Sequence, residues 1–295
     1  MSFSSETKIK LAEKAPGKDC CRHAMLAGMF RFSTFTDENT CVFQTETIEV
    51  SEAYARLFKE IAGATVVTKK VGTVYKNTLS GEDFKAVYDI VMQYGENLKD
   101  IFRCSKCDDH FFRGAFLVSG FVNPPEKPRL ELSTASPDLA CDAATTLTLH
   151  FRLPKLSVRR GNQIIYFRDA ESVHYFLSYI GAKKEAFEVI NAKMLREKNN
   201  EVNRKQNFDM ANLTKTVNAA GIYVDAIRAL MESGDFEKLP AELRTTAQNR
   251  VDNDTLTLQE LADMEEPPIS KSQVSKRLQK IYHFYEENKQ TEAKL

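Results

Sequence analysis

The feature of this 295-residue chain that most limits its fold is a pattern that occurs twice, 91 residues apart. Residues 21–30 and 112–121 are both mostly apolar, with small residues at close spacing, and Tyr75 and Tyr166 stand at the same offset. A repeated unit of this size predicts an α+β domain with pseudo-twofold symmetry. The alternative is a chance likeness between two apolar helices.

Each copy shows strand-like alternation and helical spacing in the same order. In the first copy we expect a strand at 42–50, a helix at 52–62, strands within 66–75 around Gly72, and a helix from residue 80. In the second we expect a strand at 130–133, a helix at 137–144, strands at 146–153 and 162–168, and a helix at 170–179. Together with its apolar run, each copy is expected to follow the order αβαββα.

The remainder of the chain is predicted to be helical. Residues 183–198 have helical spacing and run into the polar, basic stretch 199–207, which is either a flexible linker or an extension of that helix. A stripe spaced by three and four residues then predicts one helix that ends near Gly234; its members are Leu213, Val217, Ala220, Val224, Ile227 and Met231. The expected domains are a duplicated one (1–182, copies about 20–95 and 110–182), a linker (183–207) and an all-α domain (208–295).

Composition excludes several classes of protein. Hydrophobic residues make up 42% and charged residues 28%, a globular balance. No run of eighteen apolar residues is present, and the first eighteen residues have no apolar signal-peptide core. Six cysteines are too few for a disulfide scaffold, which favours a reducing compartment. We therefore expect a cytoplasmic protein without a membrane partner.

Although the net charge of the chain is zero, its middle segment is positively charged. Residues 152–215 carry +6, between flanks of −2 and −4. Such a segment is either a solvated basic face or a footprint for a polyanion. The side chains expected to contact phosphates are Arg152, Lys155, Arg159, Arg160, Arg168, Arg204 and Lys205.

The C-terminal region predicts a helix-turn-helix motif at about 256–288. Thr257–Glu260 and Ser270–Gln273 both have the form of a capping box, and two prolines break the helix between them. The second helix has a core stripe of Val274, Leu278 and Ile281 and a basic, hydrogen-bonding outer face. Such a face can bind the phosphates and base edges of double-stranded DNA. The expected DNA-binding residues are Ser270, Lys271, Ser272, Gln273, Ser275, Lys276, Arg277 and Lys280.

The alternative is a helical hairpin whose polar face is only solvated. Acidic neighbours (Asp263, Glu265 and Glu266) oppose a broad basic patch. Positioning on DNA would then need help from elsewhere, and the segment of charge +6 could supply it.

Residues 26–30 (LAGMF) and 112–120 (FRGAFLVSG) resemble the motif helices of LAGLIDADG homing endonucleases. Other segments, in the same order along the whole chain, are similar to the bacterial WhiA family; they are 1–5, 20–22, 113–117, 122–127, 211–216 and 270–272. The resemblance implies a degenerate LAGLIDADG domain followed by a helix-turn-helix domain. It also implies a nucleoid-associated transcription regulator, bound to promoter DNA, that acts in cell division and chromosome segregation and, in sporulating relatives, in sporulation.

The resemblance also locates the catalytic acids of the endonucleases. Those positions correspond to Ser33 and Ser119, which cannot supply the carboxylates that bind divalent metals. We therefore expect no catalytic activity and no small-molecule substrate. The alternatives are a metal-dependent endonuclease, if a shifted alignment hides an acid such as Asp37 or Glu38, or a nucleoid or division scaffold whose DNA binding is incidental. The duplicated domain is expected to contact either DNA or protein partners.

Cys104 and Cys107, followed by His110, have the spacing of a metal or redox motif. A structural zinc site needs four ligands, and the other candidates, Cys20, Cys21 and Cys141, do not form a second pair with this spacing. Packing at the start of a helix explains the cysteines more simply. The sequence thus predicts neither a metal nor a cofactor.

Overall fold

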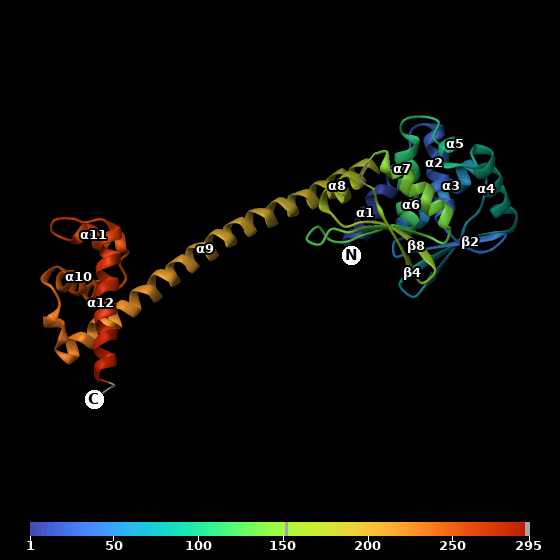
Figure 1. Cartoon of the computed structure of the whole chain (residues 1–295). Helices are drawn as coiled ribbons and strands as arrows, with labels where there is room; N and C mark the ends of the chain where they lie inside the picture. Colours follow the sequence, from blue (N-terminus) through green and yellow to red (C-terminus); the bar gives the residue numbers. More distant parts are fainter. Residues whose placement is uncertain (151–152, 293–295) are drawn as a thin grey trace. The chain divides into compact units, whose positions relative to one another are not determined.

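The computed structural model describes residues 1–150 and 153–292, which form two compact units, Met1–Glu197 and Lys198–Leu295 (Figure 1). The first copy in unit 1 consists of α2 (Asp19–Arg31), β1 (Thr34–Asp37), β2 (Thr40–Thr45), α3 (Ile48–Ala62), β3 (Val67–Val71), β4 (Val74–Ser80) and α4 (Gly81–Tyr94). The second consists of α6 (Cys107–Ser119), β5 (Phe121–Val122), β6 (Leu130–Thr134), α7 (Pro137–Thr148), β7 (Lys155–Arg159), β8 (Asn162–Phe167) and α8 (Ala170–Tyr179). Helix α1 (Phe3–Ala12) precedes the copies, and α5 (Leu98–Ile101) joins them.

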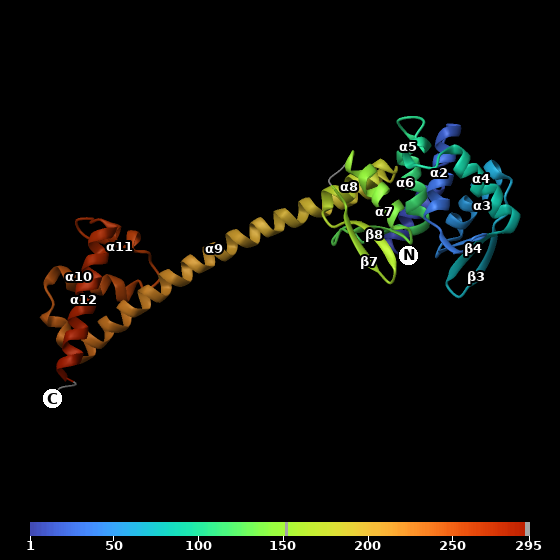
Figure 2. The same cartoon turned by 45° about the vertical axis from the view of Figure 1, so that its right-hand side comes forward.

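Each copy forms one antiparallel four-stranded sheet. The strand orders are β1-β2-β4-β3 and β5-β6-β8-β7, which are identical when the strands are counted from the start of each copy. Both sheets lie on the same side of the helices of unit 1 (Figure 2). The duplication inferred from the 91-residue offset is therefore confirmed at the level of topology.

Helices α2 and α6 pack against each other at two glycines. A Cβ atom on Gly28 would lie 2.0 Å from the carbonyl oxygen of Phe111, and one on Gly114 would lie 2.3 Å from that of Met25. The small residues of the two apolar runs thus allow the backbones to approach closely. Around this contact, one continuous hydrophobic core extends through both copies.

Each copy contains one more strand than the sequence predicted, since β1 and β5 were missed. The strand expected at 146–153 was also wrong: residues 146–148 end α7, and β7 begins at Lys155. The threonines there favour strands, but the hydroxyls of Thr146 and Thr148 each donate to the carbonyl oxygen four residues back, which keeps them within the helix. Similarly, residues 48–50 belong to α3, where Val50 and Tyr54 share one buried face.

Unit 2 is entirely helical. Helix α9 (Lys183–Ser233) contains residues 199–207, so this stretch is helical rather than a flexible linker, and Gly234 ends the helix at a φ of 78°. After it come a 3-10 turn, η1 (Asp235–Lys238), and three helices, α10 (Ala241–Asp252), α11 (Leu258–Met264) and α12 (Lys271–Glu292). No helix in the described residues is long and apolar enough to cross a membrane.

The core of unit 2 confirms part of the predicted stripe on α9. Val224 and Ile227 are buried, and Met231 packs on the core. The side chains of Leu213, Val217 and Ala220 lie outside the described residues. The other buried apolar residues of this core are Leu230, Leu239, Leu243, Ala247, Leu261, Ala262, Val274, Leu278 and Ile281.

Candidate nucleic-acid interface

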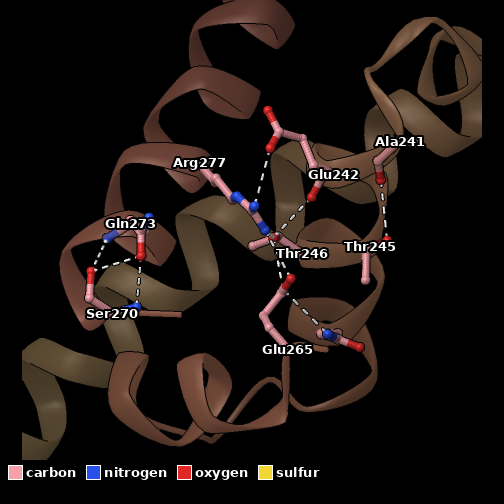
Figure 3. A network of polar contacts seen from close by, with 9 residues as sticks. Ala241, Glu242, Thr245, Thr246, Glu265, Ser270, Gln273 and Arg277 are labelled. Carbon is pink, nitrogen blue, oxygen red and sulfur yellow. Dashed lines mark hydrogen bonds and ion pairs between the residues drawn. The ribbon is translucent and has the colours of Figure 1, made fainter. Parts of the chain in front are cut away.

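Two capping boxes fix the starts of α11 and α12. The Thr257 hydroxyl accepts from the Glu260 backbone N–H at 3.3 Å, and the Glu260 carboxylate accepts from the Thr257 N–H at 2.7 Å. In α12, Ser270 and Gln273 exchange the equivalent bonds at 3.3 and 2.9 Å (Figure 3). The Ile269 N–H also donates to the Ala262 carbonyl oxygen, which fixes the turn between the two helices. Both predicted capping boxes are confirmed.

The two faces of α12 differ as the sequence predicted. Val274, Leu278 and Ile281 are buried in the core of unit 2. The opposite face exposes Lys271, Ser272, Lys276, Gln279, Lys280 and His283, while Ser275 is half-buried at its edge. In the described part of the chain, no carboxylate lies within salt-bridge distance of the three lysines. Their ammonium groups are therefore available to an anionic ligand.

Arg277 is placed differently from the predicted DNA contacts. Its guanidinium donates to the carboxylate of Glu265 at 2.9 Å, to the Thr246 hydroxyl at 3.2 Å and to the carboxylate of Glu242 at 3.2 Å (Figure 3). Glu265 is only 6% exposed and also accepts a bond from Thr246 at 2.8 Å. Arg277 thus ties α12 to α10, and its expected contact with DNA stays a prediction.

Sequence reasoning missed this network because its members are distant along the chain. Thr246 and Glu265 are 19 residues apart, and only the packing of α10 against α12 brings them together. Glu265 was counted among the acids that oppose a broad basic patch, yet its carboxylate is paired with Arg277 inside the motif. Ser270 and Gln273 are likewise engaged in the cap. The predicted DNA-binding residues with exposed side chains and no such internal role are Lys271, Ser272, Lys276 and Lys280.

The basic residues of unit 1 are exposed on and near β7 and β8. Lys155 lies on β7, and Arg160 occupies the β7–β8 turn with a φ of 51°. Arg159 pairs with Glu131 at 3.0 Å, and the guanidinium of Arg168 lies over the ring of Tyr166. Arg204 and Lys205 are exposed on α9, and Arg152 lies outside the described residues.

The first copy carries basic residues that sequence reasoning missed. Lys69 of β3 and Lys76 of β4 are exposed and stand directly opposite each other in the sheet. Like charges at this spacing destabilise a strand pair unless an anion screens them. Lys69 stands 91 residues before Arg160, but the structure places Lys69 within β3 and Arg160 in the β7–β8 turn, so the repeat did not identify it.

Ser33 and Ser119 meet at one pocket of about 480 Å³, next to the C-terminal ends of α2 and α6. Both hydroxyls donate to a carbonyl oxygen four residues back, Ser33 at 2.9 Å and Ser119 at 3.2 Å. Among the described residues, no aspartate or glutamate lines this pocket. Asp37 ends β1 and Glu38 follows it in the exposed β1–β2 turn.

The fold and the site define a class of protein in which a duplicated LAGLIDADG-type unit is joined to a helix-turn-helix unit. Family models match residues 108–199 as a WhiA LAGLIDADG-like domain and residues 202–285 as a WhiA C-terminal HTH domain. The chain is 33% identical over 300 residues to the Probable cell division protein WhiA of Desulfitobacterium hafniense (strain DSM 10664 / DCB-2), covering 95% of this chain and 94% of that relative. This chain therefore belongs to the WhiA family.

Two further comparisons agree. The Probable cell division protein WhiA of Bacillus subtilis (strain 168) is 32% identical over 310 residues, covering 97% of both chains. The crystal structure of full-length DUF199/WhiA from Thermatoga maritima matches with a TM-score of 0.60 at 23% identity, covering 97% of this chain and 99% of that one. The predicted fold class, an α+β LAGLIDADG-like domain followed by a helical domain, is confirmed.

Proposed function

We propose that this protein is a transcription regulator that binds double-stranded promoter DNA through the outer face of α12. The observation that carries the proposal is the division of that helix into a buried apolar face and an exposed face whose three lysines have no carboxylate partner among the described residues. In a helix-turn-helix, such a face enters the major groove, where lysine contacts phosphates and guanine edges and Ser272 bonds to base edges. The relatives' name, probable cell division protein, supports a role in cell division. The proposal extends this role, from the family resemblance, to chromosome segregation and, in sporulating relatives, to sporulation.

Unit 1 is assigned an auxiliary role in this proposal. Its exposed basic side chains (Lys69, Lys76 and Lys155) lie on the sheets, and Arg204 and Lys205 of unit 2, on α9, are assigned the same role. Side chains of this kind position a protein on DNA through phosphates without reading its sequence. DNA binding of this type places the protein in the cytoplasm, on the nucleoid.

The proposal includes the loss of nuclease chemistry. Mg²⁺ binds anionic oxygen, whereas the ends of α2 and α6 present the neutral hydroxyls of Ser33 and Ser119 to their shared pocket. We expect plasmid DNA to stay intact with Mg²⁺ or Mn²⁺. Specific cuts that disappear on Asp37→Ala or Glu38→Ala substitution would instead establish a metal-dependent endonuclease.

The DNA proposal is tested by fluorescence anisotropy on genomic fragments at near-physiological salt. We expect Lys276→Ala/Lys280→Ala to weaken binding to the preferred fragments about 10- to 100-fold and to reduce the salt slope by roughly 2, since each lysine displaces one counterion. Lys85→Ala/Lys99→Ala is the matched control, because it removes the same charge from exposed positions on α4 and α5. Equal, weak binding of all fragments by all three proteins would instead favour a scaffold with incidental DNA binding.

A further inference from the structure

Four cysteine thiols converge at the N-terminal ends of the two central helices of unit 1. Cys20 and Cys21 lie in the first turn of α2, Cys107 begins α6, and Cys104 lies three residues before it. Their four sulfur atoms all lie within 4.8 Å of one another. The two pairs are more than 80 residues apart in sequence, so only the packing of α2 on α6 assembles the group. The CxxC spacing alone therefore did not reveal four ligands.

The sulfur separations match the ligand shell of one tetrahedral ion. Cys104 Sγ lies 3.6 Å from Cys20 Sγ, 3.6 Å from Cys21 Sγ and 3.5 Å from Cys107 Sγ. A disulfide would require about 2.05 Å. Four sulfurs bound at about 2.3 Å to one zinc ion stand roughly 3.8 Å apart, as the edges of a tetrahedron. An iron–sulfur cluster distributes its cysteines over different iron atoms, which spreads the sulfurs further than a single ion does.

Helix N-termini and basic residues supply positive charge around the four sulfur atoms. Each helix N-terminus carries a partial positive charge, and here two helices present their N-termini to the same group. Arg103 and Lys106 add positive charge on both sides of Cys104 in the chain.

The four cysteines of the group differ in burial. Cys21 and Cys107 are buried, whereas Cys20 and Cys104 are half-buried, so an ion can enter from one side. His110, the remaining candidate ligand of the CxxC segment, lies outside the group of four. Cys141 is exposed and also lies outside it.

We propose that Cys20, Cys21, Cys104 and Cys107 bind one zinc ion as a structural site. Four thiolates select zinc over hard cations such as Mg²⁺, and a closed set of four protein ligands leaves no open position for catalysis. The ion fastens the N-terminal ends of α2 and α6, at the opposite end of these helices from Ser33 and Ser119. It thereby fixes the angle between the two copies and so the spacing of their sheets.

The first test is the metal content of the full chain purified without an affinity tag that binds metal. After dialysis against EDTA, elemental analysis is expected to find about one zinc per chain. Cobalt substituted for zinc is expected to show the absorption bands of tetrahedral thiolate coordination. Purified folded protein that retains no zinc and in which all four thiols of this group react would overturn the proposal. Two disulfides within the group would also overturn it.

Cysteine variants test whether the zinc ion binds at this group of four. Cys104→Ser/Cys107→Ser is expected to lose the zinc and to lower Tm by more than about 5 °C, because the ion stabilises only the folded state. Cys141→Ser, an exposed cysteine outside the group, is the control and is expected to retain one zinc per chain. Should the double variant fail to fold, a thiol-modifying reagent added to the wild-type chain is expected to release one zinc, measured with a chromogenic chelator. Zinc retained by the double variant, or no zinc released by the reagent, would place no ion at these cysteines.

Discussion

At the scale of single residues, neighbouring basic side chains on α12 have different roles. Lys276 is exposed without a carboxylate partner, whereas Arg277 is held by Glu265, Thr246 and Glu242. A planar guanidinium can donate to several acceptors at once, which suits it to a tie between helices. The basic run therefore combines the lysines proposed to contact DNA with an arginine that supports the helix carrying them.

Removing the acid of this tie is expected to loosen the motif. Glu265→Ala leaves Arg277 and Thr246 without their buried acceptor and should cost about 2–3 kcal/mol of unfolding free energy. Urea denaturation and peptide-resolved hydrogen exchange over residues 241–281 measure the effect. Glu266→Ala, which removes an exposed carboxylate one residue along, is the control and should change stability by less than about 0.5 kcal/mol. An equal loss of unfolding free energy in both variants would show that the Arg277 network does not stabilise the motif.

The sequence predicted the exposed lysines because helical spacing alone separates Lys276 from Leu278 and Ile281. It did not predict the burial of Glu265, because that depends on where α10 lies. The cysteine group shows the same limit. Spacing identified the pair Cys104 and Cys107, and only the packing of two helices selected Cys20 and Cys21 over Cys141 as their partners.

At the scale of elements, the contact between α2 and α6 defines unit 1. Both helices contribute a glycine at the point where the backbones come closest. The apolar runs predicted these helices well, because close small residues on both sides leave few other arrangements. The strand assignments near residue 146 were less successful, since threonine hydroxyls bonded within α7 overrode the local strand propensity.

A methyl group at this contact is expected to separate the helices. Gly28→Ala places a Cβ atom 2.0 Å from a backbone oxygen that cannot move alone, so we expect a loss of about 3 kcal/mol or more. Gly221→Ala in α9 is the matched control: among the described residues, nothing outside its own helix backbone lies within 4 Å of the added Cβ, and the change should stabilise the helix by about 0.5–1 kcal/mol. Thermal unfolding of the three proteins provides the comparison. A Gly28→Ala protein as stable as wild type would contradict the packing described here.

At the scale of the whole molecule, the chain keeps an endonuclease-like fold in unit 1 and places a helix-turn-helix in unit 2. The 91-residue repeat and the paired capping boxes indicated both units, and the resemblance to the WhiA family was needed to choose between the alternatives that each pattern left open. The role of the sheets could not be derived in this way. Lys69 and Lys76 could be recognised as a pair of basic side chains only from the structure, where β3 and β4 bring them opposite each other.

The central claim is that this protein recognises particular DNA sites through the outer face of α12. Genome-wide chromatin immunoprecipitation in its host tests this most directly, with wild-type protein compared to Lys276→Ala/Lys280→Ala at matched expression levels. We predict discrete peaks at promoters for the wild type, and their loss in the variant. Identical peaks for both proteins, or uniform occupancy without peaks for both, would contradict the account.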